Sequence, residues 1–183
     1  MENRNFAPSA EGGTWTEEHS SGTKYLCTTH FDIGDVIDAL SATFASDLLW
    51  WASPVGKEDM VKLLNNSMCF AVFQIGAIDG NQHLVGFGRL ITDRVTFAYL
   101  TDVYVVPGHQ GKGVGRWMMG CVNEILDFWP HLRGCLLLTG DPKAIKFYHE
   151  TLGAEDFKKV APGLVVLEKV GPAMKQNSHL SAA

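Results

Sequence analysis

The stretch that decides the fold is VVPGHQGKGVG, residues 105–115. It overlaps a β-rich run at 97–106 and precedes apolar side chains that recur at helical spacing from Val114 to Trp129. A strand, a glycine-rich turn and a helix therefore follow one another. Glycines at alternate positions let successive backbone N–H groups point into one concavity, where the positive end of the helix dipole also lies. The stretch predicts an anion cradle suited to a pyrophosphate.

Two familiar phosphate loops do not fit this stretch. Gly108 and Gly113 have the spacing of a nucleotide P-loop, but Val114 and Gly115 stand where Lys and Ser or Thr are needed. The dinucleotide fingerprint also fails, because its last glycine follows Gly113 by two positions instead of three. A tight connection in which the glycines only relieve crowding stays open, since short glycine patterns often arise by chance.

The patterns on both sides of the cradle predict a mixed sheet with about four helices. Turn residues at 79–81 indicate an antiparallel hairpin, and the strand, helix and strand around the cradle indicate a right-handed parallel crossover. Asp141 and Pro142 predict the start of the last helix, and Gly153 its end. The predicted strands are 24–30, 68–75, 84–91, 97–106, 134–139 and 164–169, and the predicted helices are 33–44, 60–65, 114–129 and 142–152.

The length of 183 residues suits a single domain. Residues 1–22 are polar without an apolar period, and so are the residues after 170, so we expect flexible tails at 1–22 and 171–183 around a domain at 23–170. The formal net charge of −5 has the wrong sign for broad attraction to a phosphate backbone, which argues against nucleic acid as a partner.

Four cysteines lie far apart within apolar segments, without the spacing of a zinc site. We interpret them as reduced core thiols and expect no metal. The sequence contains no apolar run of membrane-spanning length and no signal peptide at the N-terminus, so it predicts a soluble protein of the cytoplasm, or of cytoplasm and nucleus.

Three segments together resemble the GNAT superfamily of N-acetyltransferases, within a subgroup of small, mostly uncharacterised members. Residues 110–115, QGKGVG, match its signature Gln/Arg-x-x-Gly-x-Gly/Ala. Residues 101–107, TDVYVVP, look like its fourth strand, and residues 144–153, AIKFYHETLG, resemble its later Phe-Tyr motif. The resemblance covers about residues 24–170 and implies a single α/β (α+β) domain, with a mixed six- or seven-stranded sheet whose central parallel strands splay apart.

The resemblance implies acetyl-CoA as the acyl donor. Backbone amides of the strand would bind the pantetheine arm, and amides at the helix start would bind the pyrophosphate. The amide near Val103 would face the thioester carbonyl and stabilise an oxyanion. The donor-binding residues implied in this way are Val103, Tyr104, Val105, Gln110, Gly111, Lys112, Gly113, Val114, Gly115, Arg116 and Asp141, although Asp141 has a simpler role as a helix cap.

Tyr148 occupies the position of the family's general acid. A phenol whose ordinary pKa is about 10 can protonate a departing thiolate. Without the motif, packing of this ring beside Phe147 would be the better interpretation.

The residues that would serve the acceptor are less specific. Trp50, Trp51, Tyr99 and Thr101 are candidates for the acceptor pocket, although core packing suits at least one tryptophan better. Thr101 stands at the position where several members of the family carry a carboxylate that acts as the general base. Asp102 is adjacent, and we expect it to face the other side of the sheet and to pair with a basic residue. Asp93, Tyr99 or His30 could instead anchor a water relay.

The resulting hypothesis is an acetyl-CoA-dependent N-acetyltransferase that acts on a primary amine of a small molecule. The acceptor would attack the thioester directly in a ternary complex, and the protein would be a monomer or a homodimer. Two alternatives remain: a non-catalytic acyl-CoA-binding regulatory module, which the absent carboxylate at Thr101 suggests, and a protein or histone lysine acetyltransferase.

Overall fold

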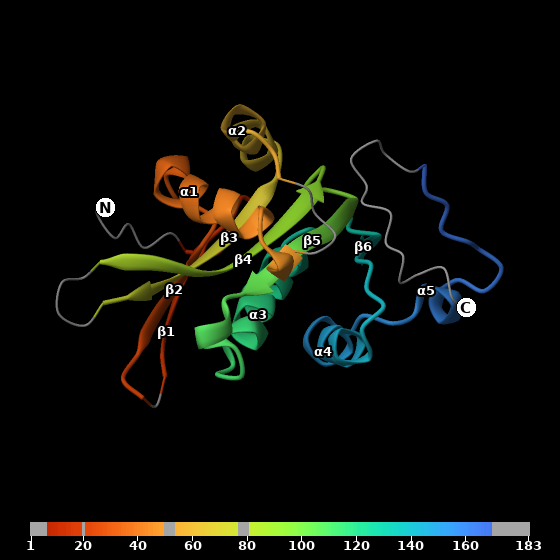
Figure 1. Cartoon of the computed structure of the whole chain (residues 1–183). Coiled ribbons are helices and arrows are strands. Elements are labelled where there is room, and N and C mark those ends of the chain that lie inside the picture. Colours follow the sequence, from red (N-terminus) through yellow and green to blue (C-terminus); the bar gives the residue numbers. More distant parts are fainter. Residues whose placement is uncertain (1–6, 20, 50–53, 77–80, 170–183) are drawn as a thin grey trace.

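A computed structural model describes residues 7–19, 21–49, 54–76 and 81–169. They form one α+β domain around a six-stranded sheet whose strands lie in the order β1-β2-β3-β4-β5-β6 (Figure 1). Neighbouring strands are antiparallel except for β5 and β6, which run parallel. The strands are β1 (Thr14–Glu18), β2 (Lys24–Thr28), β3 (Met68–Ile75), β4 (Gln82–Thr92), β5 (Phe97–Val105) and β6 (Gly134–Leu136).

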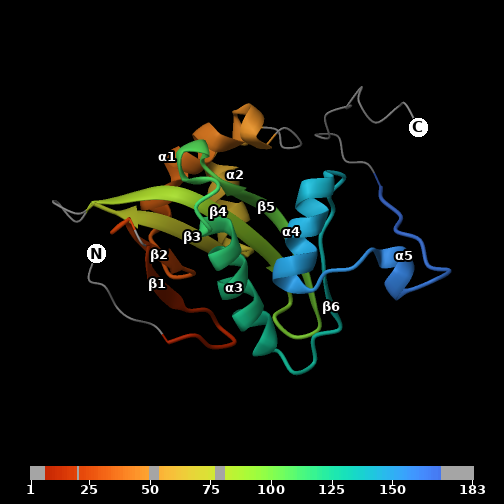
Figure 2. The ribbon, with the colours of Figure 1, turned by 90° about the horizontal axis from the view of Figure 1, so that it is seen from below.

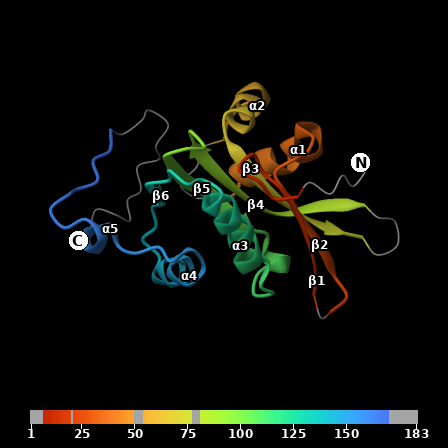
Figure 3. The same cartoon turned by 180° about the vertical axis from the view of Figure 1, so that it is seen from behind.

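Helices cover both faces of the sheet. Helices α1 (Ile33–Phe44) and α2 (Lys57–Asn65) lie on one face, and α3 (Val114–Asp127) crosses the other, with α4 (Pro142–Leu152) beside it (Figures 1 and 2). The short helix α5 (Phe157–Val160) lies at the β6 end of the molecule, away from the sheet (Figure 3). Two 3₁₀ turns, η1 (Asp47–Leu49) and η2 (Pro107–His109), complete the described elements.

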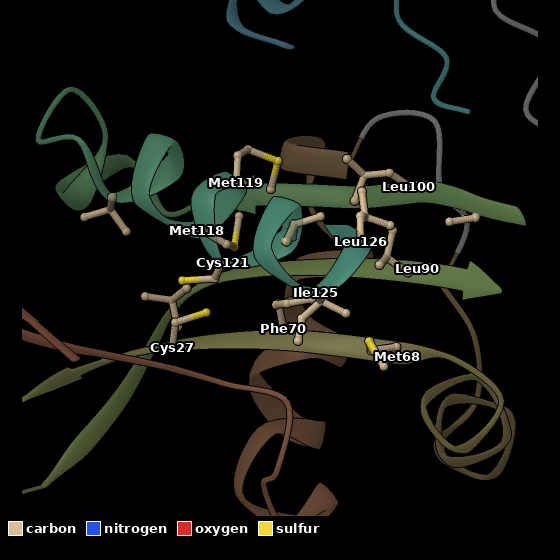
Figure 4. Packing of buried hydrophobic residues seen from close by; sticks show 14 of the residues in the cluster. Cys27, Met68, Phe70, Leu90, Leu100, Met118, Met119, Cys121, Ile125 and Leu126 are labelled. Carbon is tan, nitrogen blue, oxygen red and sulfur yellow. The ribbon is translucent and has the colours of Figure 1, made fainter. Parts of the chain in front are cut away.

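The sheet separates two hydrophobic clusters. The buried face of α3 packs on the strands in the larger cluster, where Met118, Ile125 and Phe70 are fully buried. Figure 4 shows the side chains of α3 meeting those of β3, β4 and β5, with Cys27 of β2 beside Cys121 of α3. The smaller cluster joins α1 and α2 to the opposite face. Buried strands flanked by helices on both faces explain the apolar runs in the sequence.

Most of the predicted elements are confirmed. Helix α4 begins at Asp141, whose carboxylate accepts a hydrogen bond from the Lys143 amide at 2.9 Å, and ends at Gly153 with a φ of 64°. The hairpin of β3 and β4 and the parallel pairing of β5 with β6 are also present. Strand β6 stops at Leu136, three residues before the predicted end.

The prediction of a loose tail through residue 22 is wrong for residues 14–18. These residues form β1, which pairs with β2 at the edge of the sheet. Trp15 stacks on Phe70 with ring centroids 6.2 Å apart, and its indole donates to Glu124 of α3 at 2.7 Å. The indole of Trp129 donates to the Ala10 carbonyl at 3.0 Å. An edge strand that buries little apolar surface carries a weak sequence signal, which explains why it was missed.

The predicted strand at 164–169 is also wrong. These residues carry no regular structure, and Leu164, Val165 and Leu167 are 60%, 72% and 87% exposed. A β-rich run becomes a strand only where a neighbouring strand pairs with its backbone, and none of the described strands does so here.

Candidate active site

The sheet opens between β5 and β6. The two strands pair at Phe97 with Gly134, Ala98 with Cys135 and Tyr99 with Leu136. Beyond this point β5 continues to Val105, whereas β6 has ended. The edge of β5 from Leu100 onward therefore has no strand partner on that side among the described residues. Free N–H and C=O groups on such an edge can bind an extended ligand as an added strand would.

A β-bulge lies in this free part of β5. Phe87 of β4 pairs with Tyr104 and Arg89 pairs with Thr101, so Gly88 alone faces both Asp102 and Val103. Asp102 has a φ of 53°, in the left-handed region that few non-glycine residues adopt. The bulge thus inserts one extra residue into β5.

The extra residue reverses which amides face the open edge. Before the bulge, even-numbered residues face β6, because the Thr96 carbonyl accepts from the Arg133 amide at 2.8 Å. After it, the Val106 amide donates to Val85 of β4 at 2.9 Å, so even-numbered residues face β4. The backbone groups of Val103 and Val105 therefore face the open side, where the Val105 carbonyl already accepts from the side chain of Gln110.

The glycine-rich turn leads from β5 into α3. Gly111 and Gly113 have φ values of 72° and 86°, and Gly113 is the N-cap of α3. These conformations are easy only for glycine. The first amides of α3 have no partner within the helix and lie at the positive end of its dipole. A Cβ atom built on Gly115 would lie 3.6 Å from Val105 and 3.7 Å from Phe147, so the turn also packs closely against β5 and α4.

Polar side chains near the cradle already have protein partners. The Gln110 amide donates to the Val105 carbonyl at 2.7 Å, which ties the turn to the end of β5. Arg116 forms an ion pair with Glu150 of α4 at 2.6 Å. The Tyr25 hydroxyl lies 2.9 Å from Nδ1 of His109. The pKa of His109 is lowered by burial and by the charge of nearby Lys112, so that imidazole favours its neutral form.

Tyr148 lies on α4, packed against the α3 cluster and edge-on to Phe147 with ring centroids 5.1 Å apart. Burial raises the pKa of Tyr148 to about 12. The phenol therefore stays protonated at neutral pH and can act as a proton donor. The cradle, the free edge of β5 and Tyr148 all lie around the side of the sheet that α3 and α4 cover.

The opposite face of the bulge carries a buried ion pair. Nε and Nη2 of Arg89 lie 2.8 and 2.6 Å from Oδ2 of Asp102, and Nη1 of Arg89 donates to Ser67 at 3.1 Å. The Thr101 hydroxyl donates to Oδ1 of Asp102 at 3.3 Å. The expected pairing of Asp102 with a basic residue is confirmed. The prediction that Asp102 and Thr101 face opposite sides of the sheet is wrong, because the bulge turns both side chains to one face.

The remaining candidates are scattered. Tyr104 packs on Phe87 and α1, and burial raises its pKa to about 12 despite a hydrogen bond with Thr43, so its side chain is not part of the cradle. Asp93 accepts bonds from the turn between β4 and β5, which hold its pKa well below the usual range. His30 follows β2, which β3 and β4 separate from β5. Trp50 and Trp51 lie outside the described residues.

Sequence reasoning missed Arg89 and Ser67. Arg89 meets Asp102 through the register of β4 on β5, and Ser67 meets Arg89 from the end of α2, neither of which local patterns reveal. Gly86 and Gly88 within a strand were the available signal, because glycine inside a strand often marks a bulge. Among the described residues, no group of three or more His, Cys, Asp or Glu side chains could hold a metal ion, and no helix is long and apolar enough to cross a membrane.

Comparison with known proteins agrees with this geometry. The profile of the acetyltransferase (GNAT) family matches residues 38–154. A protein of Gibberella zeae, named as an inferred acetyltransferase, is 38% identical over 135 residues, which cover 67% of this chain and 75% of that protein.

Solved structures share the fold. An inferred GNAT acetyltransferase of Xanthomonas campestris is 28% identical with a TM-score of 0.57, covering 87% of this chain and 94% of its own. A GNAT family protein of Streptococcus pneumoniae is 19% identical with a TM-score of 0.53, covering 81% and 99%. The chain therefore belongs to the GNAT family of acetyl-CoA-dependent acetyltransferases.

Proposed function

We propose that this enzyme transfers an acetyl group directly to a primary amine of a small molecule, in a ternary complex. The observation that carries the proposal is the continuity of the open edge at Val103 and Val105 with the glycine cradle along β5 and α3. Tyr148 of α4 packs on the same hydrophobic cluster as these two valines. Acetyl-CoA supplies the acetyl group as a thioester. The residues present fit such a donor, because an extended arm can lie on the free edge while its pyrophosphate reaches the cradle.

Each part has a distinct task. The amides of 113–116 hold the pyrophosphate without a metal ion, because they are free donors at the positive end of a helix. The Val103 amide donates to the oxygen that gains negative charge during transfer, which stabilises the transition state more than the ground state. Tyr148 Oη holds the proton that the sulfur leaving group requires, and its raised pKa keeps that proton in place until transfer.

The acceptor enters from the other face of the bulge in this proposal. Thr101 and Tyr99 are its candidate contacts there, with Trp50 and Trp51. Asp102 is not assigned as the base, because Arg89 and Thr101 already bond to its carboxylate oxygens. A chimera built on the spermidine N-acetyltransferase of Vibrio cholerae shares the fold at 19% identity and a TM-score of 0.51, covering 66% of this chain and 75% of its own, which makes polyamines reasonable members of a test panel.

The test is CoA release from acetyl-CoA with pooled polyamines, amino sugars, amino acids and basic peptides. We expect turnover with a small amine and about a 100-fold loss of kcat for Tyr148→Phe with little change in KM for acetyl-CoA. Tyr25→Phe is the matched control, since its hydroxyl bonds to His109 instead of facing the open edge. Equal turnover of wild type and Tyr148→Phe would remove the proton-donor role.

Two further outcomes separate the alternatives. Tight acetyl-CoA binding without turnover on any acceptor would favour a regulatory binding module. Turnover on basic peptides alone would favour a protein lysine acetyltransferase. Incubation with radiolabelled acetyl-CoA and no acceptor should leave the protein unlabelled, because direct transfer forms no covalent acetyl-enzyme.

A further inference from the structure

The bulge in β5 combines an unfavourable backbone conformation with a buried ion pair. Asp102 carries the left-handed φ of 53° and is 6% exposed. Backbone outliers of this kind persist only where the surrounding structure fixes them, and they concentrate at functional sites.

Arg89 is placed to fix the conformation of Asp102. It sits on β4 directly after Gly88, the residue opposite the bulge, and its Nε and Nη2 both reach Oδ2 of Asp102. Its third contact, to Ser67, anchors the guanidinium at the turn between α2 and β3. The planar guanidinium thus connects the bulge to two neighbouring elements, a geometry that a lysine ammonium cannot reproduce. A Cβ built on Gly88 would make only ordinary contacts with Val103 at 3.6 Å and with Met118 at 3.8 Å, so the space at Gly88 does not fix the bulge.

The conformation that Arg89 holds determines the direction of one amide. Without the extra residue, the alternation of β5 would turn the backbone of Val103 toward β4, as it does for Thr101. With the bulge, it faces the open edge beside β6. The side chains of Arg89 and Asp102 lie on the face that α1 and α2 cover, because Arg89 pairs across the strands with Cys69 of that cluster and bonds to Ser67.

We propose that Arg89 is a positioning residue for acyl transfer: through Asp102 it keeps the β5 bulge that directs the Val103 amide at the reacting carbonyl. This inference rests on the proposed function, which assigns that amide to the carbonyl. It predicts that breaking the pair lowers kcat far more than donor affinity, because the cradle at 111–116, which would hold the pyrophosphate, does not touch the pair and only the Val103 contact is lost.

The experiment compares Arg89→Met, Arg89→Lys and Asp102→Gly with the double variant Arg89→Met/Asp102→Gly. Arg89→Met should lower kcat about 10- to 100-fold with KM for acetyl-CoA within about twofold, the scale expected when a transition-state donor is misdirected. Arg89→Lys should show a similar loss of kcat, because a lysine ammonium lacks the planar, forked set of donors of the guanidinium. Glycine adopts a positive φ without help, so the double variant should regain much of the loss seen in Arg89→Met.

A direct readout is the ¹H–¹⁵N signal of Val103. Acetyl-CoA should shift this signal in wild type and in the double variant, and much less in Arg89→Met. Arg94→Met is the matched control, since Arg94 makes an exposed ion pair with Glu11, and it should behave as wild type. Stoichiometry of CoA binding by calorimetry corrects each kcat for the folded fraction.

The outcomes are separable. The proposal is overturned if Arg89→Met keeps its kcat per folded molecule, or keeps the Val103 shift, or if Asp102→Gly gives no recovery in the double variant. If wild type turns over but acetyl-CoA never shifts Val103, the amide assignment in the proposed function is wrong and this inference fails with it. Loss of folded protein alone, with kcat per folded molecule unchanged, would show that the pair only stabilises the domain.

Discussion

Gly113 of the cradle has a backbone conformation that favours glycine, whereas Gly115 has an ordinary helical one. Replacing each with alanine therefore measures the cost of the left-handed conformation apart from the cost of the added methyl group. Gly113 has open space around it, since the nearest atom to an added Cβ is His19 Cε1 at 3.9 Å, but its φ is 86°. Gly115 lies within α3, and its added Cβ would make ordinary contacts at 3.6 and 3.7 Å. The sequence signature also allows alanine at the position of Gly115.

Different magnitudes follow from these geometries. Forcing alanine into the left-handed conformation at 113 costs about 1–2 kcal/mol, which corresponds to about a 5- to 30-fold change in an equilibrium constant. If the turn keeps its shape, this cost appears as lower stability. If the turn relaxes, the cost appears as weaker binding of acetyl-CoA, because the backbone amides no longer point at the pyrophosphate. Gly115→Ala should be neutral or stabilise by up to about 1 kcal/mol, because a helical alanine loses less backbone entropy.

Denaturant unfolding and the KM for acetyl-CoA measure both effects on the same preparations. We expect Gly113→Ala to lose about 1–2 kcal/mol of unfolding free energy or to raise KM about 5- to 30-fold, and Gly115→Ala to do neither. The reasoning would be refuted if Gly113→Ala matched wild type in both measurements, or if Gly115→Ala lost as much as Gly113→Ala.

Two other predictions concern stability. Burial raises the pKa of both Tyr104 and Tyr148 to about 12, so the folded state holds their protons more tightly than the unfolded chain. This contribution is intact below pH 10 and is lost as the pH rises through 12, by about 2–3 kcal/mol for each ring. Unfolding titrations from pH 8 to 11.5 should show this decline, and Tyr104→Phe should reduce it by about half, because Tyr148 still contributes; a pH-independent wild type would contradict the assignment. Asp141→Ala removes the cap of α4 and should cost about 1 kcal/mol with KM for acetyl-CoA unchanged. A raised KM at unchanged stability would instead make Asp141 a donor contact.

Local signals predicted much of this fold. Asp141, Pro142 and Gly153 define α4 through capping that involves only near neighbours, and the turn glycines define the start of α3. Strand β1 was missed because its residues contribute few buried apolar side chains, and the strand expected at 164–169 has β propensity without a partner. The sequence also placed the cradle and Tyr148 on adjacent elements.

The bulge shows where sequence patterns stop. Alternation predicts that Thr101 and Asp102 face opposite sides, and that holds only for an uninterrupted strand. Arg89 and Asp102 are 13 positions apart and meet through strand register. A rule based on neighbouring residues cannot reveal such a pair. In our proposal, this pair determines which amide of β5 faces the open edge.

The two indole bonds of the N-terminal segment have a consequence for the order of synthesis. Trp15 bonds to a residue 109 positions later, and Ala10 accepts from one 119 positions later. At about 5–20 residues per second, a ribosome needs roughly 6–24 s to add that length. The pairs β1–β2, β3–β4 and β4–β5 can form as the chain emerges, since the two strands of each pair follow one another directly in the element order. The indole bonds must wait for α3, so the segment around Ala10 and Trp15 gains these side-chain contacts only after α3 has been made.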